Sequence, residues 1–442
     1  MLKQILKWSS LAISGTVLLG MALYSYTHSG AKSIDKTKTV YITKDENGYT
    51  LYRNGAPFRI KGVAGDNYLN SLAHIGANTI RIYDSITETL LDQAHQNNLA
   101  VIIDIAIPKY SKEYNFYEDG ENNLKLKDSV KTLVNKYKNH PALLFWNLGN
   151  ELDYPLVFRK NSFINTFNEL IDIIHTEDPD HPVGTSLIPS RTQTFSLHFH
   201  SPQLDLIGFN SFGNLKMIDP LMKKVAWATN PLPFYISEYG SNGPWEETMT
   251  TWMVPIEPTS TKKAEQYLYL YNLYIRPNKE SLGDLAFFWG QKQEHTHTWF
   301  SIFDEEGRKT EVYYILKSLW KSPISENELP PQINYMLIDG QGANDNLIYN
   351  ANEIKTAQIF MESAIDSAYQ FKWEIFKEGW NYKQTEKEDI PKKLPLHIID
   401  KKDNSITFSV PDKEGPYRLF GYVYDQKGNF ATTNIPFYVL KK

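Results

Sequence analysis

The feature that most constrains the fold is an alternation of short apolar runs with amphipathic segments, repeated between residues 59 and 320. Each apolar run is too short for a helix and has few polar positions, which is typical of strands buried on both faces of a parallel sheet. The predicted strands are Arg59–Ala64, Thr79–Asp84, Ala100–Ile107, Leu143–Leu148, Pro182–Leu187, Leu204–Asn210, Pro233–Tyr239 and Leu285–Gly290.

Most segments between these strands space their apolar residues as a helix does. The segment 188–203 is rich in Ser, Thr and His, so a regular helix is least expected there. Eight strands alternating with helices over roughly 280 residues have the number and length of a (β/α)8 TIM barrel, an α/β fold. The predicted helices are Tyr68–Ile75, Ile86–Asn97, Val130–Lys138, Phe163–His175, Lys262–Ile275 and Val312–Trp320.

Two other patterns lie on either side of the predicted strands. The first, at residues 40–60, belongs to the expected barrel domain 40–321, and the second follows that domain. Residues 40–60 predict β-hairpins, because Asn54-Gly55 is a strong turn signal, and we expect them to close the bottom of the barrel. Residues 333–442 contain short alternating segments, typical of a small C-terminal β-sandwich of immunoglobulin or fibronectin type. The proline-containing segment 322–332 is the expected linker, and we expect few contacts to cross it.

The first 31 residues predict an export segment. Lys3 and Lys7 precede a mostly apolar stretch from Leu11 to Tyr24, as in a signal peptide or an N-terminal membrane anchor. Because no clean cleavage site follows, we favour the anchor, with the body on the periplasmic or extracellular side. Residues 32–39 are then a short polar linker.

Composition excludes several functional classes. The net charge is −5 and basic tracts are limited to short Lys pairs, so nucleic acid is not an expected partner. The chain has no cysteine, which excludes disulfides and thiolate chemistry. The pairs His295/His297 and His198/His200 lack an evident third ligand, so neither a metal nor a cofactor is expected. The oligomeric state is not indicated by the sequence.

Polar residues follow two of the predicted strands at the end where TIM barrels carry their active sites. The run HPALLFWNLGNE ends on Asn150 and Glu151, and PFYISEYG carries Glu238 and Tyr239. Two carboxylates at one barrel mouth can divide a glycosidic cleavage, since one protonates the leaving oxygen while the other attacks the anomeric carbon. We expect a carboxyl separation of about 5–5.5 Å, the geometry of retaining enzymes.

Three polar residues at strand ends are expected to support the carboxylates. Arg81 would hold Glu238 ionised through a charge-assisted bond that keeps the carboxyl pKa low, although Arg81 alone is equally compatible with a structural ion pair. Asn150 would donate to the sugar 2-hydroxyl. Asn210 ends the sixth strand and completes the polar set.

Two aromatic residues are expected at the sugar subsite. Tyr239 adjoins Glu238, and Trp289 ends the eighth strand, so both would stack on or shape the sugar. Trp289 alone is also compatible with a core position at the barrel rim. Asp104, inside the third strand, is interpreted as a core carboxylate.

The two glutamate motifs resemble the signatures of a known enzyme clan. HPALLFWNLGNE and PFYISEYG are similar to the acid/base and nucleophile motifs of clan A retaining glycoside hydrolases, most closely the catalytic barrel of family 2 β-glycosidases. RIKGVAG, NTIRIYD and ISEYG also resemble family 72 β-1,3-glucanosyltransferases. The resemblance spans residues 40–321 and implies that Glu151 is the acid/base and Glu238 the nucleophile.

Some features depart from these families and leave the substrate open. The sixth strand ends in Asn210-Ser211-Phe212, where the clan has Asn-x-Tyr, and the cysteines of the fungal transferases are absent. The leading hypothesis is a retaining β-glycosidase that cleaves a β-linked glycan or exopolysaccharide. The alternatives are a β-glucan transglycosylase using the same glutamates, and a non-catalytic glycan-binding envelope protein. Sugar, linkage and endo or exo action stay open.

The N-terminal pattern predicts where the protein resides. We expect the full-length chain in the membrane or exported fraction of cells, because Lys3, Lys7 and the apolar stretch after them are typical of targeting segments. Fractionation followed by immunoblotting measures this. A matched chain lacking residues 1–31 should be recovered as a soluble protein, and recovery of the full-length chain in the soluble cytoplasm would contradict the prediction.

Overall fold

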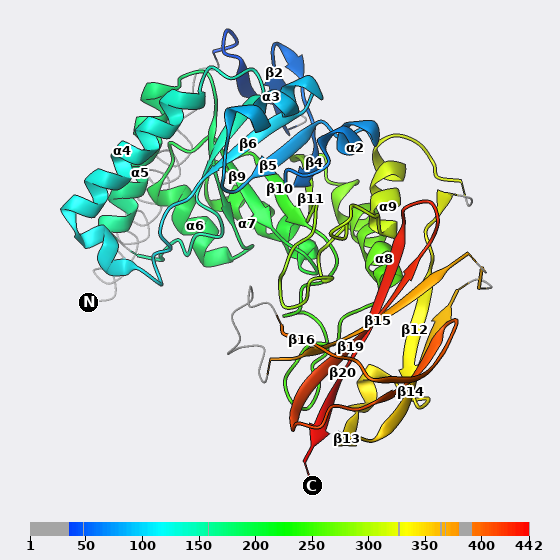
Figure 1. Ribbon diagram of the computed structural model, residues 1–442. Coiled ribbons are helices and arrows are strands. Elements are labelled where there is room, and N and C mark those ends of the chain that lie inside the picture. Colours follow the sequence, from blue (N-terminus) through cyan, green and yellow to red (C-terminus); the bar gives the residue numbers. More distant parts are fainter. Residues whose placement is uncertain are drawn as a thin grey trace, which may run out of the picture.

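The computed structural model describes residues 35–441, apart from residues 47, 158, 326–327, 363–364, 367 and 380–390. A closed barrel is followed by two mainly antiparallel sheets, which lie to one side of it (Figure 1). The predicted export segment 1–31 and the start of the 32–39 linker lie outside the described residues. Among the helices of the described part, none is long and apolar enough to cross a membrane.

Eight parallel strands close into the barrel in the order β10-β11-β4-β5-β6-β7-β8-β9. The TIM barrel is confirmed, with an eighth strand that starts earlier than predicted. That strand runs through Gly283, where an added Cβ would lie 2.0 Å from the carbonyl oxygen of Ile60, so only glycine fits. The strands are β4 (Ile60–Ala64), β5 (Thr79–Ile82), β6 (Ala100–Ile105), β7 (Leu143–Leu148), β8 (Val183–Leu187), β9 (Leu206–Asn210), β10 (Phe234–Tyr239) and β11 (Ser281–Phe287).

Helices cover the outside of the barrel. Helix α6 is regular although its sequence predicted a helix least strongly, and α7 was not predicted. The apolar residues of α7 recur at Ile218, Leu221, Met222 and Val225, so the helical spacing is present in the sequence. The helices are α2 (Leu69–His74), α3 (Glu88–Gln96), α4 (Gly120–Tyr137), α5 (Ser162–Glu177), α6 (Arg191–His200), α7 (Ile218–Ala228), α8 (Ser260–Leu270) with a π-helical end (Tyr271–Ile275), and α9 (Glu311–Trp320), with short 3-10 turns at Tyr114–Glu118, Leu215–Met217 and Ala343–Asp345.

The N-terminal hairpins pack against the bottom of the barrel. They comprise β1 (Val40–Asp45), β2 (Gly48–Arg53) and the short β3 (Ala56–Pro57). Val40 and Leu51 pack into the same buried cluster as residues from the starts of the barrel strands. The opposite end, at the carboxyl ends of the strands, therefore carries the open mouth.

The C-terminal sheets pack face to face as a β-sandwich, which confirms the predicted fold class. Ile359 and Phe408 from one sheet and Leu419 and Phe437 from the other belong to one buried cluster. The first sheet contains β12 (Ile333–Ile338), β14 (Ile354–Met361), β18 (Ser405–Ser409) and β17 (Ile398–Lys402), and the second contains β13 (Ile348–Asn350), β20 (Phe430–Leu440), β19 (Gly415–Tyr424), β15 (Gln370–Lys377) and β16 (Lys393–Leu394).

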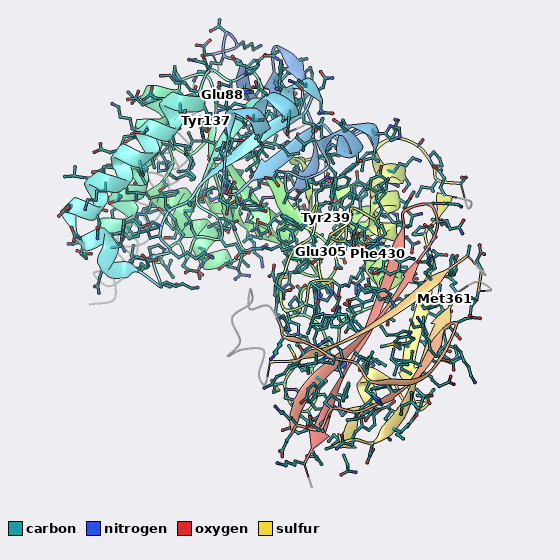
Figure 2. All side chains as sticks on the ribbon, viewed as in Figure 1. Glu88, Tyr137, Tyr239, Glu305, Met361 and Phe430 are labelled. Carbon is teal, nitrogen blue, oxygen red and sulfur yellow. The ribbon has the colours of Figure 1, made fainter. Side chains whose placement is uncertain are left out.

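The sandwich is bound to the barrel by buried hydrogen bonds, so the expectation of few contacts across the linker is wrong. Thr432 N donates to Ser260 Oγ over 2.9 Å, and Tyr314 OH donates to Asn429 Oδ1 over 2.7 Å. Figure 2 shows the neighbouring Phe430 where the two parts meet. The polar linker sequence does not predict this interface, because β19 and β20, far along the chain, form much of it, and Ile333 of β12 adds bonds to Thr259 and Thr261.

Arg418 of β19 is the most buried cation of the interface, and we predict that its loss destabilises the protein. It donates to Glu378 Oε2 over 2.5 Å and to the carbonyl oxygen of Pro255 over 2.8 Å. Arg418→Met leaves Glu378 buried without its partner and should lower the free energy of unfolding by about 3–5 kcal/mol.

Urea unfolding measures this loss. Lys355→Met is the matched control, because Lys355 is also a sandwich cation but is partly exposed, pairing with Asp339 and Glu353. Its loss should cost about 1 kcal/mol or less. Equal small effects from both variants would show that the interface network contributes little to stability.

Candidate active site

Arg81 is the centre of a buried polar cluster at the mouth of the barrel. Its side chain is fully buried and donates through Nε and Nη2 to both oxygens of Asp104, over 2.9 and 2.7 Å. Its Nη1 donates to Glu238 Oε1 over 3.1 Å and to Asn210 Oδ1 over 3.2 Å, and Nη2 reaches Asn150 Oδ1 over 2.9 Å. One guanidinium therefore joins the ends of β5, β6, β7, β9 and β10.

Glu238 is the buried carboxylate of the site. It precedes the last residue of β10, lies opposite Asn210 of β9 in the strand pairing, and is only 4% exposed. Besides Arg81, it accepts a hydrogen bond from Tyr83 OH over 2.7 Å. Two donors on Oε1 hold the carboxyl group in one orientation, as an attacking group requires.

Glu151 is the more exposed carboxylate, with its side chain 29% exposed. It follows β7 with a φ of 50°, in the left-handed region that a residue other than glycine adopts only under constraint. Its Oε1 accepts from Asn210 Nδ2 over 3.3 Å, and Lys109 Nζ lies 3.6 Å from its Oε2. The strained turn aims this carboxylate into the mouth beside Asn210.

The two asparagines link the carboxylates. Asn210 Oδ1 accepts from Arg81 and from Ser237 Oγ, while its Nδ2 donates to Asn150 Oδ1 over 2.9 Å as well as to Glu151. The oxygen of Asn150 thus has two donors, which leaves its amide NH2 group as the part that can donate to a ligand.

Arg81 contacts Glu238 as predicted, but the expected low carboxyl pKa is wrong. Burial raises the pKa of Glu238 to about 8, although Arg81 and Tyr83 act to lower it, and the charge of Glu151 adds to the increase. The physical reason is that Arg81 is already paired with Asp104 through two hydrogen bonds. Ionising Glu238 therefore adds a net negative charge to a buried cluster.

Tyr239 and Trp289 do not face the mouth, so their predicted sugar contacts are wrong. Tyr239 is fully buried on the opposite side of β10 from Glu238, with its ring centroid 5.8 Å from that of Tyr267 on α8. Trp289 is also fully buried and packs on Phe303, with ring centroids 4.8 Å apart. Alternation along a strand sends neighbours to opposite faces, which explains Tyr239. Trp289 fits the core position that its sequence also allowed.

Two residues of the site had no predicted role. Tyr83 lies two positions after Arg81, so the same alternation places both on the mouth side and gives a signal that the sequence contains. Lys109 lies in the loop after β6, and nothing in its sequence neighbourhood marks it. Asp104 is the buried partner of Arg81, in agreement with its interpretation as a core carboxylate.

An aromatic wall of four residues, Phe212, Phe287, Trp299 and Phe300, borders the mouth. They form one buried cluster against which Tyr83 packs. The ring of Phe300 lies 5.1 Å from that of Phe212, which follows β9, and 5.3 Å from that of Phe287, at the end of β11. Trp245, 42% exposed, packs at the edge of the wall. The four wall residues are themselves buried, so Trp245 is the ring here whose exposed face suits stacking on a sugar.

The candidate histidines make hydrogen bonds within the protein. His198 contacts the carbonyl oxygen of Thr194 and accepts from Leu232 N, and His200 contacts the carbonyl oxygen of Val157. His297 contacts Tyr422 OH over 2.7 Å, on the sandwich. Within the residues that the structure describes, no group of three or more His, Asp or Glu side chains is arranged to hold a metal ion.

Residues 82–244 match the family described as glycosyl hydrolases family 2, TIM barrel domain. The match contains both Glu151 and Glu238. The barrel is similar to that of family 2. No curated protein matches the chain.

Solved structures with the same fold are mostly larger proteins. A β-D-glucuronidase of Dictyoglomus thermophilum is 18% identical with a TM-score of 0.52, covering 65% of this chain and 54% of its own. A GH2 β-galacturonidase from Eisenbergiella tayi bound to galacturonate is 16% identical with a TM-score of 0.51, covering 65% and 55%. A putative β-galactosidase from Bacteroides fragilis is 14% identical with a TM-score of 0.50, covering 92% and 58%. The chain thus spans little more than half the length of these proteins, and the likeness shows the fold.

The environment of Glu238 predicts how its carboxyl group titrates. In a protein with carboxyl-labelled glutamate, the NMR signal of Glu238 should titrate near pH 8. Tyr83→Phe removes a hydrogen bond to the ionised form and should move that titration to higher pH. Tyr335→Phe, on an exposed face of the sandwich, is the matched control. A titration near the ordinary value of about 4.3 would contradict the burial argument.

Proposed function

We propose that this protein is a retaining β-glycosidase acting on a β-linked glycan. The observation that carries the proposal is the asymmetry of the two carboxylates at one barrel mouth. Glu238 is buried and held by Arg81 and Tyr83, whereas Glu151 is partly exposed beside Asn210 and Lys109. Attack needs a carboxylate held in one orientation, which the two donors to Glu238 provide, and proton exchange with a leaving group and water needs an accessible carboxyl group, which Glu151 provides.

Glu238 is proposed as the nucleophile. In its ionised form, one carboxylate oxygen attacks the anomeric carbon, and the bond from that carbon to the leaving oxygen breaks. Arg81 stabilises the ionised form and fixes its orientation through the bond to Oε1. The amide of Asn150 would donate to the sugar 2-hydroxyl as positive charge develops on the ring.

Glu151 is proposed as the acid and then the base. It gives its proton to the leaving oxygen in the first step, and in the second it takes a proton from the water that releases the sugar from Glu238. The reactive form therefore has a proton on Glu151 and none on Glu238. Because burial raises the pKa of Glu238, the fraction of Glu238 in the ionised form increases as the pH rises towards about 8.

The similarity of residues 82–244 to the family 2 barrel supports this proposal. The solved structures named above include enzymes described as acting on glucuronides, galacturonides and galactosides, so the substrate class is proposed only as a β-linked glycan or exopolysaccharide. A screen of β-glucans and other exopolysaccharides identifies the sugar. Products longer than the starting oligosaccharide would show transfer to a sugar in place of water.

Azide rescue tests the two roles separately. Glu238→Ala should lose turnover almost completely, because no carboxylate remains to form the covalent intermediate. Added azide should restore cleavage of an activated aryl glycoside and give a product of inverted configuration. Glu151→Ala should keep the first step on such a substrate, slow the second, and give a glycosyl azide of retained configuration.

Glu88→Ala is the matched control, since Glu88 is an exposed glutamate of α3, a helix on the outside of the barrel (Figure 2). It should keep wild-type rates with and without azide. Swapped configurations for the two rescued variants would exchange the roles, and full activity in both would place the catalytic site elsewhere.

A further inference from the structure

We infer that the C-terminal sandwich positions the aromatic wall of the active site, and that Tyr422 and Asn434 are its positioning residues. The inference rests on the proposed function in so far as the wall binds substrate. The segment 296–300, between β11 and α9, connects the two parts. Its first three residues bond to Glu257 and to the sandwich, and its last two, Trp299 and Phe300, belong to the wall.

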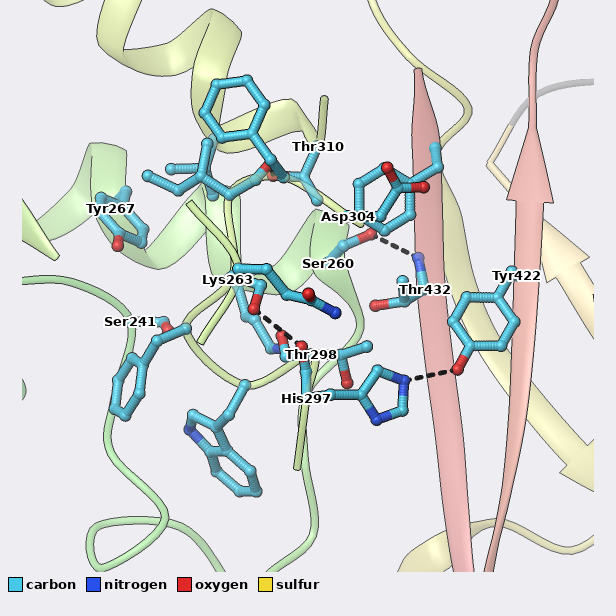
Figure 3. A pocket seen from close by; sticks show the side chains of 18 residues that line it. Ser241, Ser260, Lys263, Tyr267, His297, Thr298, Asp304, Thr310, Tyr422 and Thr432 are labelled. Carbon is cyan, nitrogen blue, oxygen red and sulfur yellow. Dashed lines mark hydrogen bonds between the residues drawn. The ribbon is translucent and has the colours of Figure 1, made fainter. Parts of the chain in front are cut away.

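Glu257 binds the segment from the barrel side. Its side chain is fully buried and accepts from Lys263 Nζ, Thr296 Oγ1 and Thr298 Oγ1 over 2.5, 2.7 and 2.8 Å. Lys263 Nζ also donates to the carbonyl oxygen of Thr298 over 2.7 Å (Figure 3). Although burial acts to raise it, the charges of Lys263 and Arg418 lower the pKa of Glu257 to about 2, so the anchor stays ionised.

Two sandwich residues complete the anchor. Asn434 Nδ2 of β20 donates to Glu257 Oε2 over 2.7 Å, and its Oδ1 accepts from Arg418 over 2.6 Å. Tyr422 OH of β19 bonds to His297 Nε2 over 2.7 Å (Figure 3). Threonines 296 and 298 therefore face Glu257, while His297 between them faces the sandwich. The segment is held from two sides.

The wall side of the segment is fixed to the loop that follows β10, the strand that carries Glu238. Trp299 Nε1 donates to the carbonyl oxygen of Asn242, four residues after Glu238, over 2.9 Å. Phe300 packs on Phe212, two residues after Asn210. A shift of the segment away from the sandwich would therefore move the wall beside both Glu238 and Asn210.

The bond to Tyr422 and ring contacts of His297 with Phe376 and Phe420 hold this segment against the sandwich. A cavity of about 40 Å³ lies between them, lined by residues that include Ser241, His297, Ser301, Tyr422 and Thr432 (Figure 3). Space of this size holds one or a few water molecules. Because the interface is not filled by side chains here, loss of one bond from Tyr422 leaves the segment room to move.

Tyr422→Phe tests the inference, because it keeps the ring stacked between Phe420 and Tyr424 and removes the hydroxyl that bonds to His297 and interacts with Glu374. Hydrogen–deuterium exchange of the folded protein should increase in the peptide covering residues 296–302. With a cleaved glycoside, KM should rise roughly threefold to tenfold, the effect of losing one hydrogen bond, while kcat stays near wild type. Asn434→Ala should show the same pattern.

Tyr349→Phe is the matched control, a buried tyrosine elsewhere in the sandwich, and it should change neither quantity. Unchanged exchange at 296–302 in both test variants overturns the inference, whether or not the protein is active. Increased exchange with an unchanged KM overturns the part that assigns the wall to substrate. Absence of glycosidase activity in the wild type overturns the proposed function, while the exchange measurement still decides the positioning.

Discussion

The buried guanidinium of Arg81 is the interaction on which the active site depends. It joins five strand ends, and its positive charge is neutralised by Asp104. The barrel therefore does not bury an unpaired charge at this position. The same pairing leaves little of its charge for Glu238. A buried carboxyl group beside an already paired cation keeps a high affinity for its proton, and this is why its pKa is raised and not lowered.

A second constraint acts at the interface of barrel and sandwich. Glu257, Lys263 and Arg418 are all buried there. Glu257 and Arg418 each have partners in both the barrel and the sandwich, and Lys263 is paired with Glu257. Such a network is costly when one member is removed, so it fixes the relative position of the two parts more sharply than an apolar surface would. The loop that carries Trp299 and Phe300 lies within it. The sandwich is therefore bonded to the loop that borders the mouth.

The fold was predictable because its signals are local and repeated. Apolar runs such as Leu143–Leu148 are too short to form a helix, and a strand of this composition is buried on both faces. The number and spacing of these runs therefore imply a closed parallel sheet. The positions of Glu151 and Glu238 at strand ends followed from the same argument, since carboxyl ends meet at one mouth. Helix α7 was missed although its apolar spacing was present, and α6 is helical despite a sequence rich in Ser, Thr and His.

The sequence by itself determined the barrel, the sandwich and five of the polar residues that meet at the mouth, Arg81, Asn150, Glu151, Asn210 and Glu238. The tertiary structure alone decided which way Tyr239 and Trp289 face, which partner takes the charge of Arg81, and how the sandwich docks. These depend on contacts between residues distant in the chain, such as Arg81 with Asp104 and Asn434 with Glu257. Burial and pairing set the charge state of a carboxylate, and neither is a property of its sequence neighbours.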